Sequence, residues 1–137
     1  MSVKHILVID DNEFMLKLIR DILEKYGFIT FTAKTGVGGY KVACEYNVDL
    51  IVLDRRLQDI DGHEVLGKLK SNSTTSRIPV AMLSSENHRS QILKSLALGA
   101  EDYIVKPFKS STLIHKTQRL LNKPTGDTTH PKEFYYV

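Results

Sequence analysis

Short apolar segments alternate with segments of helical periodicity along most of the chain. Five runs are rich in β-branched and other apolar residues, at residues 6–9, 28–31, 50–53, 78–82 and 103–105. The first and third of these runs lack polar alternation, which is typical of central parallel strands covered on both faces. Strands that alternate with helices predict a parallel sheet built of right-handed βαβ units. The pattern therefore predicts an α/β fold with five strands.

The segments between the runs carry apolar residues at helical spacing. The positions are Met15, Leu18, Ile19, Ile22 and Tyr26, then Val65, Leu66 and Leu69, then Ile92, Leu93, Leu96, Ala97 and Ala100, and last Leu113, Ile114, Thr117, Leu120 and Leu121. Asn12 is expected to cap the first helix and Gly27 to end it. Ser110 or Ser111 is expected to cap the last one. Residues 36–46 predict a further helix more weakly, because three glycines crowd its start.

Size and composition narrow the class of protein. A chain of 137 residues predicts one domain, and 42% hydrophobic with 26% charged residues indicates an ordinary globular one. The net charge of +3 is too small an excess to indicate direct nucleic-acid binding. A single cysteine excludes a disulfide framework and a multi-thiolate metal site. No apolar run approaches the roughly 20 residues that a bilayer span requires, and we expect a cytoplasmic location without membrane insertion.

Reactive side chains follow four of the five predicted strands. They are Asp10 and Asp11 after the first, Asp54 after the third, Ser84 after the fourth and Lys106 after the fifth. In an open parallel sheet these ends share one edge, where ligands bind. Clustered carboxylates are tolerable when a cation lies among them, and oxygen ligands without His or Cys select Mg²⁺ or Mn²⁺. A metal ion, an ammonium and a hydroxyl converging on a carboxylate suit phosphoryl transfer to that carboxylate.

These residues, in this order and spacing, carry a resemblance to a known family. Further matching motifs are Asp61-Gly62, residues 98–103 and Lys106-Pro107-Phe108. Over about residues 3–122, the chain resembles the receiver domain of two-component response regulators, such as the chemotaxis regulators. The resemblance implies a flavodoxin-like, doubly wound (βα)5 fold with strand order 2-1-3-4-5. It also implies a receiver domain at 1–122, followed by a C-terminal tail or linker at 123–137.

The resemblance assigns roles in phosphorylation and metal binding. Asp54 is the expected phosphoacceptor. Asp11 and Asp54, with the backbone carbonyl of Arg56, would bind Mg²⁺ or Mn²⁺ directly, and Asp10 would contribute largely through water. Lys106 would hold a phosphoryl oxygen.

The resemblance also implies a switch. A cis bond to Pro107 would turn Lys106 inward. Ser84 would bind another phosphoryl oxygen and move toward it on phosphorylation. Tyr103 would be the aromatic switch whose ring turns inward behind Ser84. The alternative for Tyr103 is a half-buried strand aromatic.

Two positions depart from the usual family pattern. Leu57-Gln58 stands where the family usually has leucine or methionine followed by proline. Arg56 stands where an amide or apolar residue is commoner. Arg56 and Glu86 are expected to face each other across the rim of the site. One hypothesis is that this pair controls water access to the phosphoaspartate and so its lifetime. The alternative is an exposed ion pair without a kinetic role.

The resemblance further implies partners. A histidine kinase or histidine phosphotransfer protein would donate the phosphoryl group. The fourth helix, fifth strand and fifth helix would form the output surface for a downstream effector or a homodimer. Basic residues expected on this surface are Arg89, Lys94, Lys109, Lys116, Arg119 and Lys123. They could meet an acidic partner or form only a solvated face. The chain could be a stand-alone receiver or the first part of a longer regulator.

Three other functions are weighed against this one. An aspartate-nucleophile phosphatase would need a second acid at the position of Arg56. A flavin-binding module would need a hydroxyl-rich phosphate loop where this chain has Asp10-Asp11-Asn12-Glu13. A phosphorylation-independent pseudo-receiver should have lost a key acid or the lysine. We therefore expect self-phosphorylation and autodephosphorylation, without enzymatic turnover.

Overall fold

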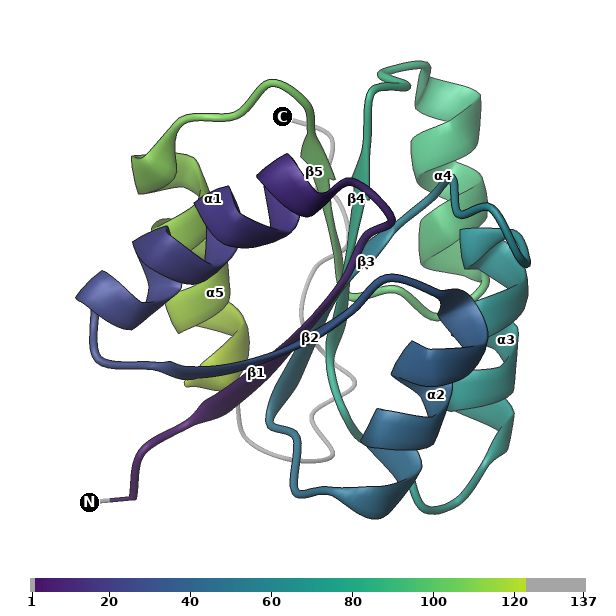
Figure 1. Ribbon diagram of the computed structural model, residues 1–137. Coiled ribbons are helices and arrows are strands. Elements are labelled where there is room, and N and C mark those ends of the chain that lie inside the picture. Colours follow the sequence, from purple (N-terminus) through teal and green to yellow (C-terminus); the bar gives the residue numbers. More distant parts are fainter. Residues whose placement is uncertain (1, 123–137) are drawn as a thin grey trace.

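A five-stranded parallel sheet lies between two layers of helices (Figure 1). The computed structural model describes residues 2–122 of the chain. The elements in chain order are β1 (His5–Ile9), α1 (Glu13–Lys25), β2 (Ile29–Ala33), α2 (Gly36–Glu45), β3 (Leu50–Asp54), α3 (Gly62–Ser71), β4 (Val80–Ser84), α4 (Arg89–Ala97), β5 (Asp102–Val105) and α5 (Ser110–Leu121). The strand order is β2-β1-β3-β4-β5, which confirms the predicted fold. Within the described part, no helix has both the length and the apolar character needed to span a membrane.

The central strand β1 buries both of its faces. Ile6 and Val8 pack in the cluster that includes α1 and α5, whereas Leu7 and Ile9 pack in the cluster that includes α2 and α3. All four side chains are fully buried. Burying an aliphatic side chain of this size stabilises a fold by about 1.5–3 kcal/mol. A continuous apolar run is therefore favourable in a strand that is covered by helices on both sides.

The fourth strand is displaced from its predicted position. The apolar run predicted a strand at 78–82, but β4 begins at Val80 and extends to Ser84. Pro79 contributes its carbonyl to the ladder by accepting from the N–H of Ile51, but it has no N–H to donate. At the other end, Ser84 pairs with Val105 of β5. The sheet thus carries Ser84 to the same edge as the acids.

The helix ends agree with the sequence in α1 and differ in α5. Oδ1 of Asn12 accepts a hydrogen bond from the N–H of Met15, and Gly27 follows α1 with a φ of +90°. This is the αL position at which glycine is favoured after a helix. The prediction that Ser110 or Ser111 caps α5 is wrong. Both residues lie in the first turn, and the cap position is occupied by Lys109, which makes no side-chain cap hydrogen bond.

Candidate functional site

Three carboxylates gather at the carboxyl edge of the sheet. Asp10 and Asp11 follow β1, and Asp54 ends β3, which is the direct neighbour of β1. One carboxylate oxygen of each residue lies within 4.8 Å of the other two. Asp10 is fully buried, Asp54 is 5% exposed, and Asp11 is partly exposed. The sheet topology therefore brings the three carboxylates of the predicted metal site together.

The ammonium of Lys106 lies between two of these acids. Nζ of Lys106 is 3.2 Å from Oδ2 of Asp10 and 3.4 Å from Oδ1 of Asp54. The main chain of Lys106 is held beside β4, because its N–H donates to the carbonyl of Ser84 at 2.7 Å. The peptide bond to Pro107 is cis, as the resemblance implied. The lysine thus lies within reach of any anionic group placed on Asp54.

Burial and mutual repulsion shape the electrostatics of this cluster. The pKa of Asp54 is raised to about 6, first by burial and then by the charge of Asp10, with Lys106 acting in the opposite direction. One ammonium beside this set of carboxylates leaves an excess of negative charge. A cation would remove this repulsion, and a donor set made only of carboxylate oxygens fits Mg²⁺ or Mn²⁺. The backbone nitrogen of Arg56 lies 3.5 Å from Oδ1 of Asp54, which places the peptide bond between Arg55 and Arg56 beside the cluster.

The hydroxyl of Ser84 is connected to Tyr103 through one residue of the loop after β4. Oγ of Ser84 accepts from the N–H of Glu86 at 3.0 Å, and the phenol of Tyr103 donates to the carbonyl of Glu86 at 2.8 Å. Tyr103 is 5% exposed, so it is more deeply buried than the half-buried strand aromatic of the alternative, and its role as a switch stays a prediction. Burial also raises the pKa of its phenol. The ring already lies inward in this structure.

Arg56 and Glu86 meet at the rim of the site. A guanidinium nitrogen of Arg56 lies 3.5 Å from Oε1 of Glu86, and the arginine side chain is 74% exposed. The carboxylate is less exposed than its partner. The geometry places the pair where the sequence predicted it, and its kinetic role stays a prediction.

Sequence reasoning did not single out Arg55, which anchors the start of α3. A guanidinium nitrogen of Arg55 donates to Oδ2 of Asp61 at 2.7 Å, and its carbonyl accepts from the N–H of Gly62 at 2.9 Å. A Cβ on Gly62 would lie 2.4 Å from the carbonyl oxygen of Asp54. Only glycine allows this approach, so the Asp61-Gly62 motif packs the start of α3 directly against the Asp54 peptide. Its place directly after Asp54 in the sequence was the signal that could have pointed to Arg55 as a residue of the site.

A buried carboxylate neutralises part of the charge of the predicted basic surface. Asp102 is fully buried at the start of β5, with Lys116 Nζ 2.8 Å from its Oδ1 and an ion pair to Arg119. Two of the six predicted basic residues therefore hold a buried acid. Another of the six, Lys123, lies outside the described residues.

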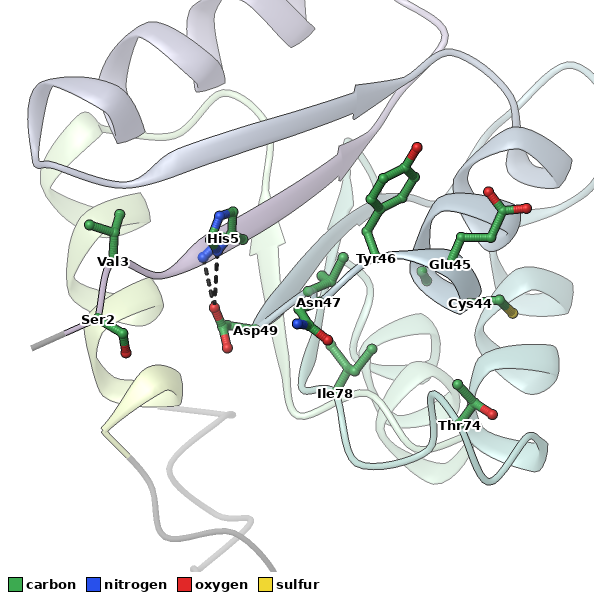
Figure 2. A pocket seen from close by; sticks show the side chains of 12 residues that line it. Ser2, Val3, His5, Cys44, Glu45, Tyr46, Asn47, Asp49, Thr74 and Ile78 are labelled. Atoms are coloured by element: carbon green, nitrogen blue, oxygen red, sulfur yellow. Dashed lines mark hydrogen bonds and ion pairs between the residues drawn. The ribbon is translucent and has the colours of Figure 1, made fainter.

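A hollow of about 490 Å³ lies beside the starts of β1 and β3, far from the cluster of Asp10, Asp11 and Asp54 (Figure 2). The N–H of His5 donates to Oδ2 of Asp49 at 2.7 Å, and the two side chains point toward one another. Cys44 and Tyr46 lie on the α2 side of the hollow. Its position at the amino-terminal edge of the sheet separates it from Asp54, so it does not belong to the carboxylate site.

Curated relatives and solved structures match most of the chain. The transcriptional regulatory protein SrrA of Staphylococcus aureus is 31% identical over 128 residues, which cover 93% of this chain and 52% of SrrA. The chain thus spans about half the length of the curated relatives it matches.

Among solved structures, a CheY-like receiver domain protein from Methanospirillum hungatei has a TM-score of 0.82 at 28% identity, covering 88% of this chain and 95% of that one. Chemotaxis protein CheY4 of Vibrio cholerae has a TM-score of 0.83 at 26% identity, covering 88% and 100%. The model of the response regulator receiver domain matches residues 6–118, which is most of the chain. With the acids, the lysine and the strand order all in place, this chain belongs to the family of response regulator receiver domains.

Proposed function

We propose that the chain is the phosphoacceptor of a two-component phosphorelay, in which a histidine kinase or a histidine phosphotransfer protein donates a phosphoryl group to Asp54. The observation that carries the proposal is the position of Lys106 Nζ, 3.2 Å from Asp10 and 3.4 Å from Asp54, within a cluster of three acids. A lysine that served only to pair one acid would not need the other two carboxylates beside it.

The cluster fits a bound Mg²⁺ ion, with Mn²⁺ as a substitute. Asp11, Asp54 and the carbonyl of Arg56 would hold the ion, and Asp10 would act largely through water. When bound, the ion would neutralise charge on the phosphoryl oxygens during transfer. The receiver domain of the sensor histidine kinase PA1611 from Pseudomonas aeruginosa was solved with a magnesium ion coordinated in its active-site cleft. That domain supports the proposal by its fold, and the oxygen-only donor set of this chain supports it independently.

The residues of the chain have distinct tasks in the transfer. A carboxylate oxygen of Asp54 attacks phosphorus, the N–P bond of the donor phosphohistidine breaks, and the imidazole leaves with the electron pair of that bond. The product is an acyl phosphate on Asp54. Lys106 pairs with one phosphoryl oxygen, and this new pairing would draw it from Asp10. Ser84 donates its hydroxyl to another oxygen.

The switch then follows from the loop after β4. Movement of Ser84 toward the phosphoryl group would pull on Glu86 and so on the phenol of Tyr103. A hollow of about 430 Å³ lies over β5 and the start of α5, and Tyr103 is among the residues that line it. We assign this surface of α4, β5 and α5 to a downstream effector or to a homodimer.

An exposed apolar pair suits docking of the phosphodonor. Phe14 is 74% exposed in the first turn of α1, and Leu18 lies one turn further on the same helix. Both come shortly after Asp11, so a protein bound there would have its histidine near Asp54. Exposed apolar side chains next to a site are typical of a protein-binding surface.

We further propose that the protein carries out no enzymatic turnover and that it is cytoplasmic. Arg56 occupies the position where an aspartate-nucleophile phosphatase needs its acid, which supports self-phosphorylation and autodephosphorylation without enzymatic turnover. A pseudo-receiver that acts without phosphorylation is the second candidate, and the complete set of Asp10, Asp11, Asp54 and Lys106 counts against it. We place the protein in the cytoplasm.

Intact-mass measurement tests the proposal. The protein is incubated with Mg²⁺ and acetyl phosphate, alongside Asp54→Asn and a control, Asp21→Asn, which changes an exposed carboxylate of α1. The expected result is one phosphoryl group on the wild type and on the control, and none on Asp54→Asn. Phosphorylation of Asp54→Asn would overturn the assignment of the acceptor. No phosphorylation of any variant, by acetyl phosphate or by a phosphorylated kinase, would favour the pseudo-receiver.

A further inference from the structure

A buried polar contact joins α3 to α4 outside the carboxylate cluster. Nε2 of His63, the second residue of α3, lies 2.7 Å from Oγ of Ser95 in α4. His63 is 9% exposed and Ser95 is fully buried. A hydrogen bond shielded from water is strengthened by the low local dielectric, and loss of one partner exposes the other to its full desolvation cost. The contact therefore bears on where α4 lies.

Few other buried contacts hold α4 in place. The helix has nine residues, of which Ser95 and Leu96 are buried, and Ile92 packs partly buried against the core. Its N-cap residue, His88, makes no side-chain cap hydrogen bond. The neighbouring α3 (Figure 1) buries five residues and is capped by Asp61. A helix with so small an apolar contact depends more strongly on a single polar one.

The α3 side of the contact is fixed to the peptide of the phosphoacceptor. Oδ1 of Asp61 accepts from the N–H of His63 at 2.8 Å. Gly62 packs on the carbonyl of Asp54 and donates its N–H to the carbonyl of Arg55. The backbone of His63 is thus fixed, through Gly62, next to the Asp54 peptide, and its ring reaches across to Ser95 on the helix of the proposed output surface.

The second nitrogen of this ring is unsatisfied. Nδ1 of His63 is buried without a hydrogen-bond partner among residues 2–122. The charged groups that face the ring are Arg55 after β3, Asp61 at the start of α3, Glu86 in the loop after β4 and Lys94 in α4. Burial and the positive charge of Arg55 outweigh the carboxylates and hold the pKa of His63 below its ordinary value. A charged ring would donate from both nitrogens, and the closed interface offers Nδ1 no acceptor.

We propose that His63 is a positioning residue for α4: the neutral ring fixes the helix through Ser95, and uptake of a proton by the ring releases it. In the tautomer in which Nε2 carries the proton and donates to Oγ of Ser95, the incoming proton comes from solvent and binds Nδ1, which has no partner among residues 2–122. The new N–H needs an acceptor, so water enters between α3 and α4. The inference rests on the proposed function, because α4 belongs to the proposed output surface, and it makes that surface sensitive to pH as well as to Asp54.

Hydrogen exchange of the α4 amides tests the proposal without any phosphodonor. The ring of His63 is first titrated by NMR, and exchange is then measured at one pH above and one pH below its midpoint and corrected for intrinsic rates. Wild-type α4 is expected to exchange about fivefold faster at the lower pH, the factor that corresponds to one net hydrogen bond of about 1 kcal/mol. Ser95→Ala should exchange fast at both pH values. His63→Gln should exchange slowly at both, because the amide keeps the hydrogen bond and does not titrate.

Matched controls come from the start of the same helix. His88→Gln and Ser90→Ala change an exposed histidine and an exposed serine and should keep the wild-type pH response. The proposal is overturned if wild-type α4 exchange stays constant while the ring of His63 takes up its proton. It is also overturned if His63→Gln keeps the wild-type response, a readout that does not depend on Ser95→Ala folding. Phosphorylation of Asp54 in the mass experiment is a separate result, so failure of one proposal leaves the other assessable.

Discussion

The phenol of Tyr103 donates a hydrogen bond of 2.8 Å to the main-chain carbonyl of Glu86. The N–H of the same glutamate donates to Oγ of Ser84. The loop after β4 is thereby attached through one residue both to a hydroxyl of the candidate site and to an aromatic ring of β5. A displacement of Ser84 therefore has a direct physical connection to Tyr103.

Tyr103→Phe should loosen this loop while the ring stays in place. The change removes the phenol oxygen and leaves the carbonyl of Glu86 without its donor, at an expected cost of about 0.5–1.5 kcal/mol in the free energy of unfolding. Urea denaturation measures that cost, and hydrogen exchange of residues 85–88 measures the local loosening. Tyr26→Phe is the control, because Tyr26 is 56% exposed after α1. Equal loop exchange in Tyr103→Phe and wild type would contradict the prediction.

Lys106→Met should impair phosphorylation far more than it impairs folding. The variant keeps an unbranched side chain, one atom shorter than lysine, but removes the ammonium that lies beside Asp10 and Asp54. Loss of one preorganised charge that stabilises a transferring group costs about 10²–10³ in rate. The rate of acyl phosphate formation from acetyl phosphate, followed by intact mass, measures the effect. Lys109→Met, on an exposed neighbouring lysine, should react like wild type, and a similar loss in both variants would contradict a specific role.

The sheet and the edge of the site could be predicted because both depend on simple patterns. Uninterrupted apolar runs such as residues 6–9 require cover on both faces, and residues that follow parallel strands meet at one edge. The grouping of Asp10, Asp11 and Asp54 could therefore be predicted from the sequence alone. The strand order came from the family resemblance, since periodicity does not specify which strands are neighbours.

Contacts between side chains of distant elements could not be predicted in the same way. The bond between His63 and Ser95 joins residues 32 positions apart, and neither lies in a pattern that specifies its partner. The burial of Asp102 with Lys116 depends on how α5 packs against β5. The start of β4 was misplaced because the apolar run includes Ile78, which lies before Pro79 and outside the ladder. Such details follow from tertiary packing, which overrides local pattern.

Asp54→Asn should stabilise the protein when divalent cations are absent. Burial and Asp10 raise the pKa of Asp54 to about 6, against an ordinary value near 4. Below about pH 4, Asp54 is protonated in both states and its burial costs no extra stability. The free energy of unfolding falls as pH rises from there through the folded pKa near 6, and the full cost of burying the charged carboxylate remains above it. At pH 7.5 in EDTA, thermal or urea unfolding should show a gain of about 1–2 kcal/mol, within the roughly 3 kcal/mol that such a shift sets as an upper bound.

Added Mg²⁺ should reverse this order. Binding to the folded state alone stabilises wild type by about 2.7 kcal/mol at hundredfold excess over Kd, which exceeds the advantage of Asp54→Asn, whereas Asp54→Asn has lost one ligand. Asp21→Asn is the control and should follow wild type with and without the ion. Stabilisation of Asp54→Asn by Mg²⁺ to the same extent as wild type would show that the ion binds elsewhere.

Arg56→Asn and Glu86→Ala should both shorten the lifetime of the phosphoaspartate. Our hypothesis is that the ion pair at the rim covers one approach of water to Asp54, but the arginine is 74% exposed, so the pair contributes at most about 1 kcal/mol. That value limits the acceleration of dephosphorylation to about fivefold. Decay of the phosphorylated protein is followed by intact mass after removal of acetyl phosphate. The exposed pair of Lys17 and Asp21 on α1 supplies the control, because Asp21→Ala breaks an ion pair of 2.7 Å remote from the site. Unchanged decay in both rim variants would show that the pair lies over the site without controlling its water.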